Sequence, residues 1–121
     1  MIRKLNFVSV PTRDQARALQ FWTEMIGFKV ATDQPMGNGQ RWIELTIPGA
    51  QTAVVLFTPE GQEDRIGTFF NASFGCDDVD YTYDLLKKRG VVFTGPPEKQ
   101  PWGVFARFRD PDGNTFILSG R

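Results

Sequence analysis

Histidine is absent from this sequence of 121 residues, which narrows the chemistry that its side chains can perform. Without imidazole there is no Ser-His-Asp or Cys-His nucleophile and no metal site built on histidine. Cys76 is the only cysteine, and with no histidine to activate it we interpret it as a small buried hydrophobe. The remaining charged candidates are Glu44, which can act as a base or pair with a cation, and Arg107, which can pair with a carboxylate or phosphate.

Arg107 lies in a segment, residues 101–118, whose composition predicts a β-hairpin. The centre of the segment, residues 110–114, combines Asp, Pro, Gly and Asn, which are turn residues. Apolar residues alternate on both sides of this loop and share one face of the hairpin: Ala106, Phe108, Phe116 and Leu118. The opposite, mixed face carries Phe105, Arg107, Arg109, Thr115, Ile117 and Ser119.

The bulk composition indicates a single domain over residues 1–121. Forty per cent of the residues are hydrophobic, and eleven Phe and three Trp are ample to fill a core. Fourteen basic and fourteen acidic residues leave no net charge, so neither nucleic acid nor an anionic membrane surface is an expected partner. No apolar run approaches the ~20 residues that span a bilayer, and the N-terminus lacks a signal-peptide pattern. Because the one cysteine cannot form an internal disulfide, we expect a cytoplasmic protein.

The first half of the chain is predicted to form one strand, one helix and three further strands. The first strand covers residues 4–10, and Pro11 ends its pairing. A helix follows from a Thr12 or Asp14 cap to about Ile26, because apolar residues recur at helical spacing. The later strands are expected at residues 28–32, 41–47 and 52–58, with a loop at residues 33–40.

The second half repeats this order after a polar segment, residues 59–68, which we interpret as a linker or lid. A strand over residues 69–76 leads to a helix that Asp77 or Asp78 caps and that ends at Arg89. A short strand at residues 91–93 and a turn-rich loop at residues 95–98 precede the hairpin. The repeat predicts an α+β fold of two βαβββ modules, about residues 1–58 and 69–121, that form a curved mixed sheet around a cavity with the helices outside.

Several short motifs occur in the order that is typical of one superfamily. They are Phe21-Trp22, Ile26-Gly27-Phe28, Asp77-Asp78-Val79-Asp80, Lys88-Arg89-Gly90-Val91, Pro101-Trp102-Gly103 and Phe108-Arg109-Asp110-Pro111-Asp112-Gly113-Asn114. Together with the βαβββ repeat, these motifs make nearly the whole chain resemble the vicinal oxygen chelate superfamily. That superfamily includes glyoxalase I, extradiol dioxygenases, fosfomycin-resistance enzymes and bleomycin-binding proteins.

The resemblance implies a divalent metal that His or Glu residues hold on four strands, but the corresponding places in this chain carry other residues. They fall at Phe7, Leu56, Asn71 and Ile117. Three of these side chains are hydrocarbons, and one neutral amide cannot replace the water around a divalent cation. We therefore expect no metal site and no cofactor.

Strand alternation predicts an aromatic and aliphatic cavity lining with a few polar groups, which is typical of small-molecule sites. Trp42, Trp102 and Phe105 could stack a planar ligand, although Trp42 and Phe105 could equally fill the core. Arg107 is expected to point into the cavity, lose water and need an acceptor, either Glu44 or an anionic ligand. The candidate ligand-binding residues are Phe7, Ser9, Trp42, Glu44, Leu56, Asn71, Ser73, Trp102, Phe105, Arg107 and Ile117.

These residues favour a metal-independent binding protein, similar to bleomycin-resistance proteins, for a planar or hydrophobic ligand that can be anionic. The alternative is a glyoxalase-like lyase or isomerase, or another enzyme of the superfamily, that lacks the usual metal ligands and uses Glu44 as a base. A third hypothesis is an interaction subunit whose cavity is packed shut. We expect a homodimer, because two four-stranded sheets leave open edges and single-domain members of the superfamily usually pair.

Overall fold

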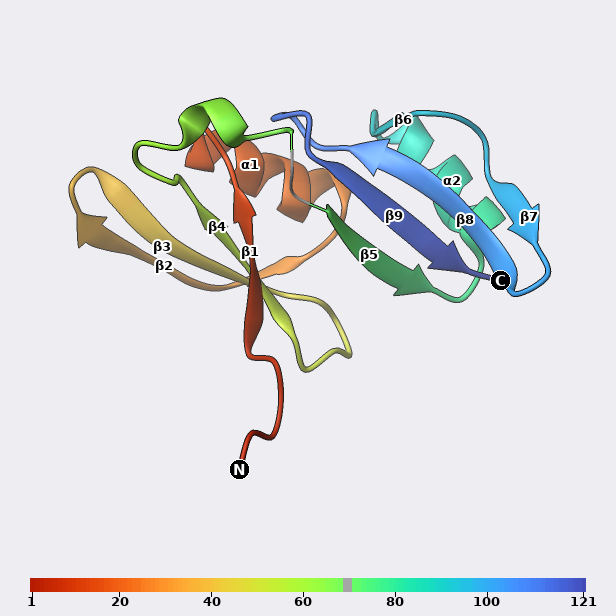
Figure 1. Ribbon diagram of the computed structural model, residues 1–121, viewed down its shortest axis with the longest axis horizontal. Helices are drawn as coiled ribbons and strands as arrows, with labels where there is room; N and C mark the ends of the chain where they lie inside the picture. The colour runs from red at the N-terminus through yellow and green to blue at the C-terminus, as the bar shows by residue number, and fades with distance from the viewer. Residues whose placement is uncertain (69–70) are drawn as a thin grey trace. The chain divides into compact units, whose positions relative to one another are not determined.

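The computed structural model describes residues 1–68 and 71–121, which divide into two units, Met1–Ile66 and Gly67–Arg121. The first unit holds strands β1 (Phe7–Pro11), β2 (Lys29–Gly37), β3 (Gln40–Thr46) and β4 (Ala53–Phe57). They form a sheet in the order β1-β4-β3-β2, in which β1 is parallel to β4 and the other neighbours are antiparallel (Figure 1). β1 and β2 are therefore the edges of this sheet.

A helix that changes its pitch covers one face of the first sheet. The Asp14 side chain caps α1 (Gln15–Gln20) by accepting a hydrogen bond from the Arg17 N–H. The chain then continues as a π-helical turn, η1 (Phe21–Met25), before Gly27 ends it at φ 100°. The predicted helix to about Ile26 is confirmed, and Phe21, at 5% exposure, is also buried in the core. The 3.6-residue spacing alone did not predict this burial.

Two predicted boundaries in this unit are wrong. The loop expected at residues 33–40 is instead the end of β2 and a tight turn at Asn38-Gly39, whose φ angles are 57° and 75°. Asn-Gly suits such a turn, since both central positions need positive φ. Pro35 and Gly37 are rare inside strands, so the sequence favoured a loop here. An edge strand tolerates both residues, and the β2–β3 register is irregular between them. Likewise, β1 begins at Phe7, not residue 4, and includes Pro11, which pairs with Phe57.

The polar segment after β4 belongs to the first unit and is fastened to it. It contains one short 3-10 turn, η2 (Glu63–Arg65). The Arg13 guanidinium donates hydrogen bonds of 3.1 Å to the carbonyl oxygens of Glu63 and Ile66. The Ile66 side chain is buried at 3% exposure. The segment predicted as a linker or lid is thus held at its far end by a hydrogen-bonded arginine and a buried isoleucine.

The second unit contains β5 (Asn71–Cys76), α2 (Val79–Lys88), β6 (Val92–Phe93), β7 (Glu98–Gln100), β8 (Gly103–Arg109) and β9 (Thr115–Gly120). Its sheet has the order β5-β9-β8-β6, with β7 also paired to β8 and with β5 parallel to β9. Asp78 caps α2, as one of the two predicted candidates. The first two residues of the strand predicted at 69–76, Phe69 and Phe70, lie outside the described residues. Short β7 was not predicted.

Aromatic rings fill the space between α2 and the second sheet. Phe108 lies 5.4 Å from Phe116 and 5.9 Å from Phe93 between ring centroids, and Tyr83 of α2 lies 4.6 Å from Phe93. The hairpin face predicted to be apolar is confirmed, with exposures of 4% or less at Ala106, Phe108, Phe116 and Leu118.

In the described ranges, no helix has both the length and the apolar character needed to cross a membrane.

A hydrogen-bonded loop joins β8 to β9. The Asp110 carboxylate accepts hydrogen bonds from the backbone N–H groups of Asp112 and Asn114 and from the Asn114 side-chain amide, at 2.9–3.0 Å. The side-chain amide oxygen of Asn114, Oδ1, in turn accepts a hydrogen bond from the Gly67 N–H at 3.0 Å. A Cβ at Gly67 would lie 2.6 Å from the Asp112 carbonyl oxygen, so no other residue fits there without a shift. The turn predicted at residues 110–114 is confirmed.

Burial raises the pKa of Asp110 from 3.8 to about 6, against the opposing effect of its hydrogen bonds from Asn114. Between these values the folded protein keeps a proton that the unfolded chain has released. The free energy of unfolding should therefore fall by about 2–3 kcal/mol as the pH rises from about 4 to about 6. Asp110→Asn should remove this pH dependence of the free energy of unfolding. Any effect of the amide itself on the loop should be the same at every pH.

Urea unfolding of the wild type and Asp110→Asn at pH 4, 5, 6 and 7 measures the effect as a difference between the two proteins. Asp84→Asn, on the exposed surface of α2, is the matched control and should leave the pH dependence unchanged. A wild-type minus Asp110→Asn difference that stays constant across this pH range would contradict the prediction.

Candidate functional site

Each sheet has one face covered by a helix and one face without a helix. In the first unit α1 contacts β4, and the register places Val10, Leu56 and Ile43 in one row across β1, β4 and β3. These three residues are 0–1% exposed and lie on the helix-covered face. Because side chains alternate along a strand, Ser9, Val55 and Glu44 form a row on the helix-free face.

The expected cavity-face position of Leu56 is therefore wrong. Leu56 shares a row with Val10 and Ile43 and is completely buried on the side of the helix. All five residues of β4 are apolar, so the strand lacked the alternation that would have identified its faces. Its place on the helix-free face is taken by Val55. The metal-ligand position expected on β4 thus moves by one residue and remains a hydrocarbon.

An aromatic pair occupies the helix-free face of the first sheet. Phe7 and Trp42 lie on the strands that flank β4, and their rings meet edge to face with centroids 5.5 Å apart. To meet they must cross β4, which explains why Val55 is only 1% exposed. The Trp42 indole N–H donates a 3.3 Å hydrogen bond to the Glu44 carboxylate. The structure thus brings together three predicted residues, and Ser9 lies in the adjoining row.

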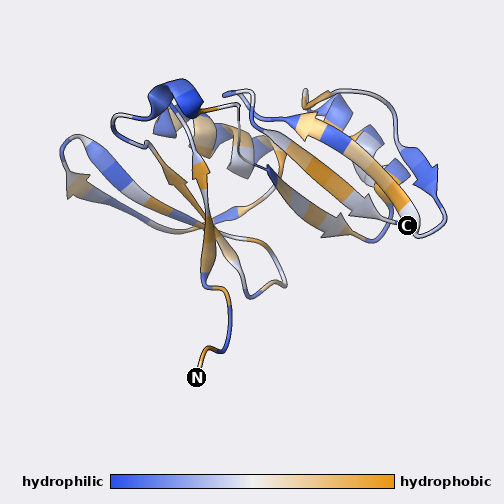
Figure 2. Ribbon diagram, viewed as in Figure 1, coloured by the Kyte–Doolittle hydropathy of each residue, from blue (hydrophilic) through white to orange (hydrophobic). Residues whose placement is uncertain are grey.

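The second sheet places all five predicted residues of its strands on the helix-free face. Ser73, Ile117 and Arg107 form one row across β5, β9 and β8. Neighbouring rows hold Asn71 with Thr115 and Arg109, and Gly75 with Ser119 and Phe105. α2 contacts β8 and β9, where the buried phenylalanines pack below it. Blue, hydrophilic bands interrupt the orange of β8 in Figure 2, as this alternation requires.

A stack of two rings and a guanidinium lies along the edge of this face. The Trp102 and Phe105 rings are stacked, with centroids 5.8 Å apart and planes inclined by 20°. The Arg107 guanidinium carbon lies 4.9 Å from the centroid of the Phe105 ring. Trp102 is 66% exposed and Arg107 is also exposed, so the expectation of a desolvated arginine is wrong. The guanidinium is held by a cation–π contact and remains open to solvent.

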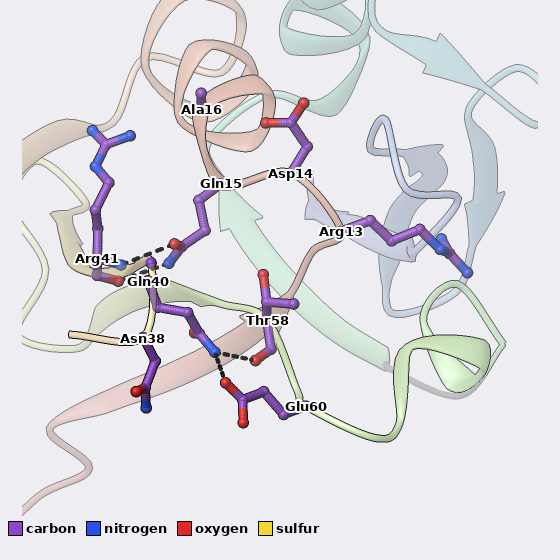
Figure 3. A pocket seen from close by; sticks show the side chains of 10 residues that line it. Arg13, Asp14, Gln15, Ala16, Asn38, Gln40, Arg41, Thr58 and Glu60 are labelled. Atoms are coloured by element: carbon purple, nitrogen blue, oxygen red, sulfur yellow. Dashed lines mark hydrogen bonds between the residues drawn. The ribbon is translucent and has the colours of Figure 1, made fainter. Parts of the chain in front are cut away.

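A polar groove of about 500 Å³ in the first unit was not predicted. It lies where the start of α1 meets the Asn38-Gly39 turn and the end of β4 (Figure 3). The Gln15 amide donates to the Arg41 and Leu56 carbonyl oxygens and accepts from the Arg41 N–H. The Gln40 amide donates to the Thr58 carbonyl oxygen and to Glu60. These groups bind one another and hold α1 to the sheet, so we assign the groove no ligand.

An ion pair between Arg41 and Asp33 lies beside this groove. The Arg41 guanidinium donates to both carboxylate oxygens of Asp33, with an Nε–Oδ1 distance of 2.9 Å. This hydrogen bonding lowers the pKa of Asp33. No predicted residue lies here, because the sequence interpretation had placed Asp33 in a loop. Asp33 and Arg41 lie diagonally across the β2–β3 pair, since Asp33 is opposite Ile43 and Arg41 is opposite Pro35.

Within residues 1–68 and 71–121, no three or more Cys, Asp or Glu side chains gather where they could hold a metal ion. The four expected ligand positions, after the correction on β4, are Phe7, Val55, Asn71 and Ile117. Three hydrocarbons and one exposed amide do not fit a divalent cation. These four residues are therefore unsuited to hold a divalent metal ion.

Comparison with known proteins agrees with this architecture. Residues 4–118 match the family described as the Glyoxalase/Bleomycin resistance protein/Dioxygenase superfamily. YetH of Bacillus subtilis (strain 168) is 39% identical over 118 residues, which cover 98% of each chain.

Two solved structures are also similar over nearly their whole length. TnmS3, described as an antibiotic binding protein from Streptomyces sp. CB03234, is 37% identical with a TM-score of 0.87, covering 98% of this chain and 96% of its own. UcmS2 is 31% identical with a TM-score of 0.90 and full coverage of both chains. With its α+β fold and two mixed sheets, this chain belongs to the glyoxalase/bleomycin resistance protein/dioxygenase superfamily.

Proposed function

We propose that this protein binds a planar, largely hydrophobic small molecule without using a metal. The observation that carries the proposal is the stack of Trp102, Phe105 and Arg107 on the helix-free face of the second sheet. An exposed indole that lies nearly parallel to a second ring offers a flat apolar surface, and flat surfaces favour flat ligands. The description of the 37% identical TnmS3 as an antibiotic binding protein supports a binding role.

The helix-free face of the first sheet supports the same proposal. Phe7 and Trp42 present aromatic surface, and the hydrogen bond from the Trp42 indole to Glu44 fixes the orientation of the ring. A general base must be free to accept a proton from a substrate. The enzymatic alternative assigned that task to Glu44, one carboxylate oxygen of which accepts a hydrogen bond from the Trp42 indole N–H. We therefore assign Glu44 to positioning Trp42.

Ligand binding should depend on the exposed indole of Trp102. For the aromatic or antibiotic compound that gives the largest thermal shift in a screen, we expect Trp102→Ala to weaken binding by about 1–2 kcal/mol, through lost stacking and buried area. Isothermal titration calorimetry of this variant measures the loss. Tyr81→Ala removes an aromatic side chain of similar exposure, 67%, from α2 and is the matched control.

The control should bind as the wild type does, since Tyr81 lies on the helix and not on the sheet face. If a compound binds the wild type and binds Trp102→Ala no more weakly, the aromatic surface of the second sheet is not its site. If no aromatic compound binds at millimolar concentration, the proposed function is wrong.

Metal removal should leave the protein unchanged. With hydrocarbons at Phe7, Val55 and Ile117 and one amide at Asn71, no divalent cation contributes to folding or to ligand binding. We expect the same melting temperature and the same affinity for the screened compound with and without EDTA. A stoichiometric divalent ion in protein purified without added metal, or a melting temperature that falls in EDTA, would contradict this.

We also propose that the chain forms a homodimer. β1 is an edge strand, and the preceding segment projects from it with Ile2 98% and Leu5 61% exposed (Figure 1). A second copy could cover both the open edge and these apolar side chains. Light scattering should give twice the chain mass at micromolar concentration, and Ile2→Asp combined with Leu5→Asp should shift the mass toward a monomer. A monomeric wild type would refute the proposal.

A further inference from the structure

The helix-free face of the second sheet carries two arginines and no carboxylate on its three long strands. Arg107 and Arg109 are two residues apart on β8, so their side chains leave the same face. The residues that share this face on β5 and β9 are neutral: Asn71, Ser73, Gly75, Thr115, Ile117 and Ser119. In a chain with no net charge, this face is therefore locally cationic.

Neither guanidinium is neutralised by the protein. Both arginines are exposed, and within the part of the chain that the structure describes neither forms an ion pair with a carboxylate. The nearest acid in the strand register is Glu98 of β7, which pairs with Phe105 and not with either arginine. Two solvated cations thus stand side by side, at a backbone spacing of about 7 Å.

Each arginine has neutral hydrogen-bond donors in its own row. Thr115 is opposite Arg109, and Asn71 lies one strand further along the same row, while Ser73 lies in the row of Arg107 beyond Ile117. A hydroxyl or amide near a guanidinium can donate a hydrogen bond to another oxygen of the same anion. The face therefore offers two adjacent groups of anion donors and not a single one.

The first donor row adjoins the aromatic stack. Phe105 precedes Arg107 on the same face, its ring contacts the guanidinium, and the exposed Trp102 ring stacks on Phe105. Along β8, the helix-free face therefore carries the Phe105 ring, then the Arg107 guanidinium, then the Arg109 guanidinium. A complementary ligand has a flat ring system at one end and two negative charges at the other.

We propose that the ligand class of this site is a fused-ring aromatic compound with two acidic groups at the same end. The ring lies on Phe105 and Trp102, the first carboxylate binds Arg107, and the second binds Arg109. This inference rests on the proposed function and adds its charge requirement. It gives Arg109 the role of selecting diacids over monoacids.

Four naphthalene probes that differ in charge and substitution test the inference by calorimetry at low ionic strength. They are naphthalene-2,3-dicarboxylate, naphthalene-2,6-dicarboxylate, 2-naphthoate and naphthalene-2-carboxamide. An exposed ion pair contributes up to about 1 kcal/mol, so each correctly placed charge should tighten binding about fivefold. We expect the 2,3-diacid to bind most tightly, the 2,6-diacid and the monoacid about equally, and the amide most weakly.

Variants separate the two arginines. Arg109→Gln should abolish the preference for the 2,3-diacid over 2-naphthoate and leave the affinity for 2-naphthoate within twofold of the wild type. Arg107→Gln should weaken both acids about fivefold and leave the amide unchanged. Lys99→Gln removes a cation from neighbouring β7 at a position paired with Val104, on the other face, and should change none of the affinities.

The outcomes distinguish this inference from the proposed function. Equal binding of the amide and the acids, or tighter binding of the 2,6-diacid than the 2,3-diacid, would overturn the inference and leave aromatic binding intact. A diacid preference that survives Arg109→Gln would also overturn it. Absence of binding by every naphthalene probe would overturn both.

Discussion

The Asp110 carboxylate, with the three N–H groups whose hydrogen bonds it accepts, determines where β8 turns back into β9. That turn sets Phe108 opposite Phe116 and Arg107 opposite Ile117. Since side chains alternate, the phenylalanines pack beneath α2 and the arginine leaves the other side. β9 then sets the register of β5 and adds Ser73 to the row. The positions of the proposed anion donors all derive from one buried turn.

The sequence predicted the helix-free face of the second sheet well because the pattern there is strongly alternating. Ala106 and Phe108 alternate with Arg107 and Arg109, so the apolar residues identify the core side and the arginines must lie opposite. The prediction for β4 was wrong for the opposite reason. Its five residues are all apolar, so no alternation of polar and apolar residues identifies the two faces of the strand. The buried face of β4 can be assigned only from the pairing of Leu56 with Val10 and Ile43, which belongs to the tertiary structure.

The features that the sequence did not predict depend on contacts distant in the chain. The π-helical turn at Phe21–Met25 has no local signal, and Pro35 with Gly37 disguised an edge strand that tolerates them. The polar groove needs the start of α1 and the Asn38-Gly39 turn to meet. Alternation along a strand predicts on which side of the sheet Arg107 lies. It does not predict how much of that side other groups cover, and so it could not predict that Arg107 is exposed.

In the second sheet the same strands serve two purposes on opposite faces. Phe108 and Phe116 cannot change without opening the core, whereas Arg107, Arg109, Ser73 and Asn71 make no packing contact on which the fold depends. Substitutions on the exposed face therefore carry little risk of unfolding. The proposed ligand-binding face of this scaffold can therefore change in single steps, each of which leaves a viable protein.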